Sequence, residues 1–312
     1  MSLVKRCRFI GLLGVVFGTN AVAGGQDYCQ YLRSTNTVDT EPDFCIDNPS
    51  ESIKSQTIEG SLNEMNLGSG SSTSFAFEYR TTDTMFTHPV DDLSTQTNLG
   101  TVTESLRAMA FDESANTLYA LDNDAKALVT VDQLSGGLTT VGPLTNLDPT
   151  DDVTGLDIAP DGTCYVTSTD TTTNTLYTCD LATGTLTVVG SQTTTPFLVG
   201  IAADCDGNLY GHDIGSDSIY NINTSDGSAS LIGATGIDAN FTQDLTYDRE
   251  SDTLFGYIYI GQSQNVYAQI DVCTGNATAL NTDDPFGAYI GASKTDCALS
   301  EVIFSDGFDS DC

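Results

Sequence analysis

Apolar and polar residues alternate along most of this chain, in short runs that end at glycine or aspartate. Three clear examples are LTTVG at residues 138–142, LTVVG at 186–190 and ASLIG at 229–233. A period of two is typical of half-buried β-strands, and the SG, TG and DG pairs before these runs favour tight hairpin turns. Thr, Val, Ile and Tyr are common while the helix formers Lys, Arg and Glu are scarce, so the pattern predicts an all-β protein.

The runs belong to a longer repeat with three landmarks in constant order. The first is an apolar stretch that ends in Asp (MAFD, IAPD, IAAD, LTYD), and the second is a Leu-Tyr pair or a close variant. The third is a turn string, whose copies start 48, 43 and 48 positions apart, while the Leu-Tyr pairs lie 46, 45 and 45 positions apart. The turn string reads DQLSGGLTTVG at 132–142, DLATGTLTVVG at 180–190, NTSDGSASLIG at 223–233 and DVCTGNATALN at 271–281.

Each copy contains four predicted strands, as in SLRAMAF, TLYALD, ALVTVD and LTTVG of the first complete copy. A period of about 45 residues with four strands is typical of a β-propeller blade. Four complete copies cover about residues 104–283, and partial copies flank them. We therefore predict a β-propeller over residues 75–304, with about five four-stranded blades and a ring closed by N- and C-terminal strands. Six blades would need strands from the weakly patterned residues 52–65.

The first residues have the three parts of a secretory signal peptide, with basic residues before the apolar run FIGLLGVVFG and small residues up to Ala23. This run is shorter than the roughly 20 residues of a membrane span. We expect residues 1–23 to be cleaved and the protein to be secreted, periplasmic or at the cell surface. Residues 24–74 then form an N-terminal segment and linker, and residues 305–312 a C-terminal tail.

The chain is strongly acidic, with 43 acidic and 10 basic residues and a formal charge of −33. Removal of residues 1–23 takes three basic and no acidic residues, which leaves −36. Such a charge repels nucleic acid and anionic lipid, so we expect neither as a partner.

Eight cysteines remain after cleavage, and an even number in an exported chain suggests disulfides. Cys164 and Cys179 flank a predicted hairpin and are expected to pair across it. We also predict Cys29 with Cys45 in the N-terminal segment, and Cys273 with Cys297 between the last repeat and the closing strand. Cys205 and Cys312 are left over. Zinc binding is disfavoured because the chain has no C-x-x-C motif and only two histidines.

The repeat D-x-x-T-G-x-h-T-x-h-G after a Leu-Tyr strand resembles those of secreted bacterial propellers in the style of the YVTN and NHL groups, many of them uncharacterised. The resemblance covers about two thirds of the chain and implies a propeller fold without implying an activity. The ending VIFSDGFDSDC also resembles an F-x-D-G-F tail of exported proteins from Gram-negative bacteria.

Candidate chemistry is sparse. The string NLDPTDD brings Asp148, Asp151 and Asp152 into one connection between blades, and such oxygen ligands suit Ca²⁺. His212 beside Asp213 is the one candidate general base within a complete blade, although a single histidine at a strand end is more often structural. No G-x-S-x-G elbow or phosphate-binding loop occurs.

Three classes of function follow from these observations. The favoured one is an exported, acidic binding or surface-interaction module, stabilised by Ca²⁺ or not, for an extracellular or envelope protein or glycan. The second is a metal-assisted hydrolase or lyase that uses His212 and axial carboxylates. The third is a structural protein that self-associates through exposed edge strands.

Overall fold

The computed structural model describes residues 72–79, 82–240, 243–262, 264–284 and 288–297. The predicted signal peptide, the Cys29–Cys45 pair, Cys312 and the C-terminal tail lie outside these residues. Within the described ranges, no helix is long and apolar enough to cross a membrane.

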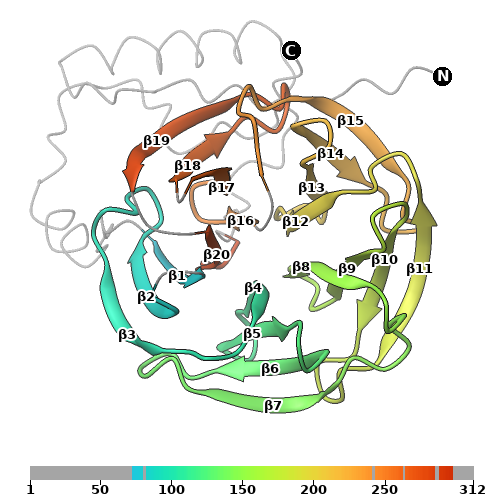
Figure 1. Ribbon diagram of the computed structural model, residues 1–312, viewed down its shortest axis with the longest axis horizontal. Helices are drawn as coiled ribbons and strands as arrows, with labels where there is room; N and C mark the ends of the chain where they lie inside the picture. Colours follow the sequence, from blue (N-terminus) through green and yellow to red (C-terminus); the bar gives the residue numbers. More distant parts are fainter. Residues whose placement is uncertain (1–71, 80–81, 241–242, 263, 285–287, 298–312) are drawn as a thin grey trace, which may run out of the picture. The chain divides into compact units, whose positions relative to one another are not determined.

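The described strands form five antiparallel sheets of four strands each, arranged as the blades of a ring (Figure 1). Blade 1 combines β20 (Ala288–Lys294) with β1 (Thr73–Tyr79), β2 (Thr84–Pro89) and β3 (Thr97–Thr101). Blade 2 contains β4 (Leu106–Asp112), β5 (Thr117–Asp122), β6 (Ala127–Val131) and β7 (Leu138–Pro143). Blade 3 contains β8 (Asp152–Ile158), β9 (Cys164–Thr169), β10 (Asn174–Cys179) and β11 (Leu186–Gln192).

Blade 4 contains β12 (Leu198–Ala203), β13 (Leu209–Asp213), β14 (Ser218–Ile222) and β15 (Ala229–Ala234). Blade 5 contains β16 (Asp244–Asp248), β17 (Thr253–Gly261), β18 (Gln264–Ile270) and β19 (Ala277–Asp284). The first strand of every blade lies near the central axis, and the fourth strand runs along the outside of the ring (Figure 1). The predicted five-bladed propeller is therefore confirmed.

The ring closes in blade 1, where strands from opposite ends of the propeller pair. The late strand β20 lies innermost and pairs with β1 over seven residues, from Thr73 opposite Lys294 to Tyr79 opposite Ala288. This pairing confirms the predicted closure by N- and C-terminal strands. Each blade then buries both faces against its neighbours, as at the junction of blades 1 and 2, where Phe77, Met85, Leu106 and Leu118 are fully buried.

The turn string repeats because each of its parts has a separate structural task. Its first residue caps the turn, as Asp132 does when its carboxylate accepts hydrogen bonds from the backbone N–H groups of Leu134 and Ser135. The middle glycine has a positive φ, 75° at Gly184, which side chains disfavour. The last glycine permits close approach of the next blade, because a Cβ on Gly190 would overlap the carbonyl oxygen of Asp226. The same overlap would occur at Gly100, Gly142 and Gly233.

The junction of blades 5 and 1, called here the seam, departs from this rule. Asn281 stands in place of the last glycine, and its side-chain oxygen accepts a hydrogen bond from the backbone N–H of Leu93 at 3.1 Å. The turn it meets in blade 1 has Ser94 instead of the turn glycine, and Asp92 caps this turn. A side-chain contact thus replaces the close backbone approach at the one junction where the repeat is degenerate.

Two disulfides lie within the described residues. Cys164 and Cys179 are directly opposite on β9 and β10 and are bonded, with Cα atoms 5.1 Å apart, as the hairpin predicted. Cys297 is bonded to Cys205, so the predicted Cys273–Cys297 pair is wrong. The reason is topological: Cys205 lies in the hairpin after the axial strand β12, near the point where the chain leaves the axial strand β20, whereas Cys273 lies in the outer turn between β18 and β19.

We expect Gly190→Ala to lower the free energy of unfolding by about 1–3 kcal/mol, because the new methyl group must push blades 3 and 4 apart. Urea denaturation measures the change. Gly137→Ala is the matched control, because Gly137 has an ordinary φ and its Cβ would lie 3.3 Å from the flexible Ser135 hydroxyl. Equal losses in both variants would contradict the assigned role of Gly190.

Candidate functional site

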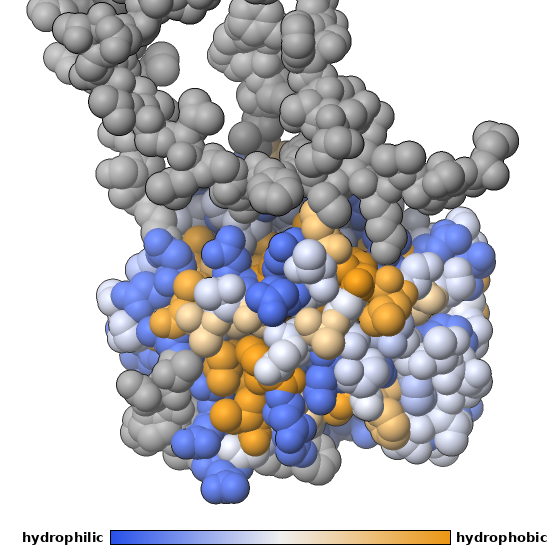
Figure 2. Space-filling model, turned by 90° about the horizontal axis from the view of Figure 1, so that it is seen from above, coloured by the Kyte–Doolittle hydropathy of each residue, from blue (hydrophilic) through white to orange (hydrophobic). Residues whose placement is uncertain are grey.

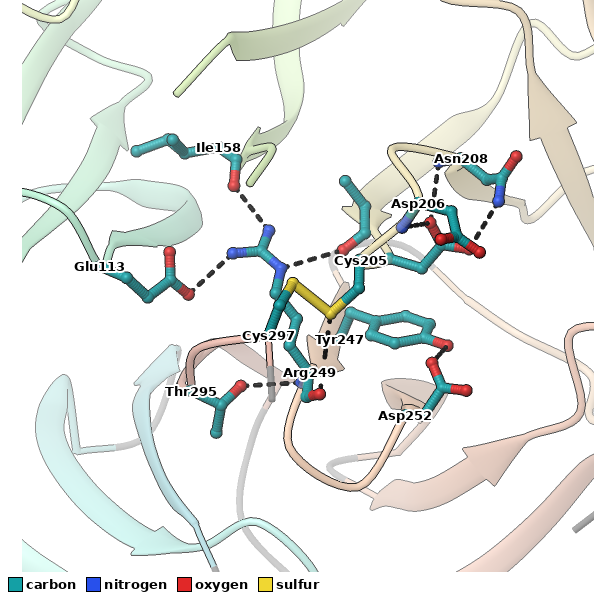
Figure 3. The surroundings of a disulfide bond; sticks show 12 residues. Glu113, Ile158, Cys205, Asp206, Asn208, Tyr247, Arg249, Asp252, Thr295 and Cys297 are labelled. Carbon is teal, nitrogen blue, oxygen red and sulfur yellow. Dashed lines mark hydrogen bonds and ion pairs between the residues drawn. A yellow bond between two sulfur atoms is a disulfide. The ribbon is translucent and has the colours of Figure 1, made fainter. Parts of the chain in front are cut away.

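The most connected polar group in the described structure is Arg249, the first residue after β16, at one end of the central axis. Its guanidinium donates Nη1–H to Glu113 Oε1 at 2.7 Å, Nη2–H to the Ile158 carbonyl at 2.6 Å and Nε–H to the Ala203 carbonyl at 3.3 Å (Figure 3). Its backbone N–H donates to Thr295 Oγ1 at 2.8 Å. These partners belong to blades 2, 3 and 4 and to the end of blade 1, so one residue of blade 5 is bonded to the other four blades.

The Cys205–Cys297 disulfide lies beside Arg249 at the same end of the axis (Figure 3). It bonds the hairpin of blade 4 to the segment that follows β20, and the Cys205 sulfur lies 3.7 Å from the Arg249 carbonyl oxygen. Arg249 is only 5% exposed. Every nitrogen of the guanidinium already has a protein acceptor, so this end of the channel is occupied by the protein itself.

The acids around Arg249 have raised pKa values despite the nearby positive charge. Burial raises the pKa of Glu113 to about 7 and outweighs the opposing attraction of Arg249. Burial likewise raises the pKa of Asp157 to about 6. The Asp157 carboxylate lies 3.5 Å from Arg249 Nη2 and accepts a hydrogen bond from the backbone N–H of Ala203 at 2.6 Å. Desolvation therefore costs the charged acids more than the arginine returns.

Asp244, the first residue of β16, forms a second cross-channel link. Its Oδ2 accepts hydrogen bonds from the backbone N–H groups of Met109 on β4 and Gly291 on β20, both at 3.3 Å. Its Oδ1 accepts from the N–H of Leu245 at 3.0 Å. Burial raises the pKa of Asp244 well above its usual value. The carboxylate thus ties blade 5 to blades 1 and 2 through backbone groups of the axial strands.

His212 does not face the channel. It lies on β13, the second strand of blade 4, and is fully buried. Side chains alternate along a strand, so His212 points to the same side as Tyr210, which packs against blade 5. Burial lowers the pKa of His212 to about 4, and the neighbouring Gln243 side chain opposes this only in part. Neither ring nitrogen makes a hydrogen bond of ordinary geometry within the described residues.

The other candidate groups also have structural partners. Asp213 is buried and accepts hydrogen bonds from the Phe197 N–H at 3.1 Å and the Ser216 hydroxyl at 2.8 Å. His88 lies 2.7 Å from the Tyr257 hydroxyl through Nε2 and 2.7 Å from the Pro89 carbonyl through Nδ1. Burial lowers the pKa of His88 to about 4.

The three aspartates proposed as calcium ligands have different environments. Asp148 caps its own turn by accepting hydrogen bonds from Thr150. Asp151 is buried and accepts a hydrogen bond from the Ser168 hydroxyl at 2.7 Å, while Asp152 faces the Asn123 amide at 3.0 Å. In the part of the chain that the structure describes, no three acidic, histidine or cysteine side chains are grouped to hold a metal ion. Calcium binding by these residues stays a prediction.

The fold and the repeat define the class of this protein as a five-bladed β-propeller. The chain belongs to the family of DUF6923, a repeat of unknown function, whose model matches residues 81–247. The resemblance to propeller repeats is thus correct at the level of the fold, and the family shown is DUF6923. No curated protein matches the chain.

Several solved propellers are similar to the chain at low identity. TolB from Acinetobacter baumannii is 12% identical over 73% of this chain and 68% of its own, with a TM-score of 0.46. Regucalcin, a calcium-binding protein from Agrobacterium tumefaciens, is 16% identical over 67% and 70%, with a TM-score of 0.44. A gluconolactonase from Xanthomonas campestris is 13% identical over 69% and 77%, with a TM-score of 0.47. Likenesses of this strength carry no argument about function.

Sequence reasoning missed Arg249, Asp244 and Glu113. A signal for two of them exists in the first landmark, because the residue that follows its aspartate is Glu113 in MAFD and Arg249 in LTYD. The same position is Cys205 after IAAD. Three chemically distinct residues at one repeat position that precedes a hairpin indicate that this position meets its counterparts at the axis.

We expect Arg249→Met to lower the free energy of unfolding by about 3–5 kcal/mol near neutral pH, because Glu113 and Asp157 lose their buried cationic partner. Urea denaturation measures this loss. It should shrink near pH 5, where both acids are largely protonated in the folded protein. Arg107→Met is the control, because Arg107 lies over the Tyr79 ring away from the channel, and should cost less than about 1 kcal/mol. Equal losses at both pH values would argue against the electrostatic assignment.

Glu113 should make the protein less stable as pH rises through a defined window. Its pKa is raised from 4.5 to about 7, so the unfolded chain releases this proton at lower pH than the folded protein does. The free energy of unfolding should therefore fall between about pH 4.5 and about pH 7 and then level off. Glu113→Gln should flatten this decline in urea denaturation, whereas Glu104→Gln, at an exposed acid, should leave it unchanged. A decline of the same size in Glu113→Gln would disprove the assignment.

Proposed function

We propose that this propeller is a non-catalytic binding module of an exported compartment, and that its acidic loops bind a positively charged partner. The observation that carries the proposal is the imbalance of accessible charge on a rigid ring. Only four basic residues lie in the described ranges, and the two lysines among them already have partners. Lys126 contacts Asn123 and Asp152, and Lys294 lies over the Phe111 ring and donates to Gln133.

Many of the aspartates are retained for turn capping, and this capping also keeps them ionised. Hydrogen bonds from Ser135 lower the pKa of the exposed Asp132, and those from Thr172 lower the pKa of Asp170. The acidic side chains are therefore fixed in position on turns between rigid strands. A surface of this kind attracts cationic partners over long range and speeds their association, an effect that salt weakens.

Enzymatic activity is less well supported than binding. The hydrolase or lyase alternative relies on a histidine that reaches substrate at the axis, but His212 is fully buried between blades and His88 is only 2% exposed. The channel end around Arg249 is filled by side chains that bond one another. The accessible polar groups are those of the loops, which favours recognition over acid–base chemistry.

Self-association remains a separate proposal with one observation in its favour. Leu231 on β15 and Leu280 on β19 are 55% and 38% exposed on the outside of the ring. Figure 2, seen from the side of these strands, shows apolar and polar surface interspersed there. Oligomers in dilute solution by light scattering would support this function, and a monomer would count against it.

The binding proposal is tested by calorimetric titration of the protein with a short Lys-rich peptide and with a Glu-rich peptide of equal length. The Lys-rich peptide should bind with a defined stoichiometry, and its affinity should fall by about tenfold or more between about 50 and about 200 mM salt. The Glu-rich peptide should not bind. Binding of both peptides, of neither, or of the Lys-rich peptide without saturation would overturn the proposal.

A further inference from the structure

The seam between blades 5 and 1 holds a cavity of about 240 Å³. Val90 and Phe255 supply apolar wall, and Asp91, Asp248 and Glu250 supply carboxylates. The volume is just below the roughly 300 Å³ at which small-molecule sites begin, so it suits a fragment or a single side chain. No basic residue lines the cavity.

The aspartate that ends the first landmark differs between blades 4 and 5. In blade 4, both oxygens of Asp204 are satisfied: Oδ1 accepts from the N–H groups of Asp206 and Asn208, and Oδ2 accepts from the Asn208 amide and the Tyr210 hydroxyl. In blade 5, Asp248 Oδ2 accepts from the N–H and the hydroxyl of Ser251. Asp248 Oδ1 is buried and has no hydrogen-bond partner in the described residues.

The missing partner has an identifiable cause. The second landmark places Tyr210 in blade 4 and Phe255 at the same position in blade 5. Phe255 has no hydroxyl, so the donor that satisfies Asp204 has no counterpart beside Asp248. Phe255 and Asp248 both line the cavity, which thus combines an unsatisfied buried acceptor with space next to it. A buried carboxylate oxygen without a donor costs free energy that a bound donor would recover.

We propose that this cavity binds a primary ammonium group on an aliphatic stem, such as a lysine side chain of a partner. This inference rests on the proposed function and names the chemical group that the acidic module recognises. The ammonium would donate to Asp248 Oδ1 in place of the absent tyrosine hydroxyl, and the stem would pack on Val90 and Phe255. The Phe255 ring adds a favourable surface for a cation.

The hydrogen bonds already present in the cavity favour ammonium over guanidinium. Ser251 occupies one oxygen of Asp248, and the Ser72 hydroxyl donates to Glu250 Oε2 at 2.9 Å. Neither carboxylate therefore has two vacant oxygens for the planar fork of an arginine. Single oxygens on separate carboxylates match the three diverging N–H donors of an ammonium group.

The test uses Nα-acetyl-lysine methylamide as the probe, with the norleucine and arginine analogues as neutral and guanidinium controls. Binding is followed by NMR through the shifts of the Val90 methyl groups. The lysine probe should bind at least about tenfold more tightly than either analogue, as expected for a charge-assisted hydrogen bond.

Phe255→Tyr is the decisive variant, because it restores the hydroxyl of the other blades beside Asp248. It should weaken binding of the lysine probe by about tenfold or more while keeping or raising the melting temperature, so a folding defect cannot explain the loss. Glu250→Gln should also weaken binding, and Glu104→Gln, at an exposed acid outside the cavity, should not.

The outcomes separate the two proposals. If the Lys-rich peptide binds with salt dependence but Phe255→Tyr and Glu250→Gln bind the lysine probe as the wild type does, the cavity assignment is wrong and the binding module stands. Equal binding of the norleucine analogue would also overturn the cavity assignment. If no basic probe binds, both proposals fail.

Discussion

The ring depends on a single guanidinium that is bonded across its axis. Apolar packing holds each blade to its two neighbours, but it does not by itself fix how the five blades meet at the centre. Arg249 does so, because its donors reach blades 2, 3 and 4 and its backbone reaches the segment after β20. Asp244 repeats the principle with an acceptor that collects N–H groups from β4 and β20. Buried polar groups of this kind cost desolvation, yet they specify one arrangement of the blades.

The seam combines the least regular sequence with the most distinctive chemistry. Four junctions between blades use a glycine so that backbone can approach backbone, whereas the fifth uses the Asn281 side chain. The two strands that meet in blade 1 come from opposite ends of the propeller, so this junction cannot form until the ring is complete. The same seam contains Phe255 in place of the repeat tyrosine and the carboxylate oxygen of Asp248 that lacks a donor. Departures from the repeat therefore mark the region where a specific ligand is best accommodated.

The acidity of the chain has two physical origins with opposite consequences. Turn aspartates such as Asp132 and Asp170 accept hydrogen bonds that favour the carboxylate, so they remain charged on the surface. The axial acids Glu113, Asp157 and Asp244 are buried, and burial favours their neutral forms. Net charge alone does not distinguish these groups, because their pKa values depend on solvent access and on hydrogen-bond donors supplied by other blades.

The sequence by itself determined the repeat, the all-β class, the five blades, the closure by terminal strands and the Cys164–Cys179 bond. These features depend on local periodicity and turn chemistry, which a linear pattern records. It did not determine the Cys205–Cys297 bond, the Arg249 network or the burial of His212. Those depend on which residues of different blades meet at the axis or between sheets, over separations such as the 92 residues between Cys205 and Cys297. Only closure of the ring brings such residues together, so the tertiary structure alone decided them.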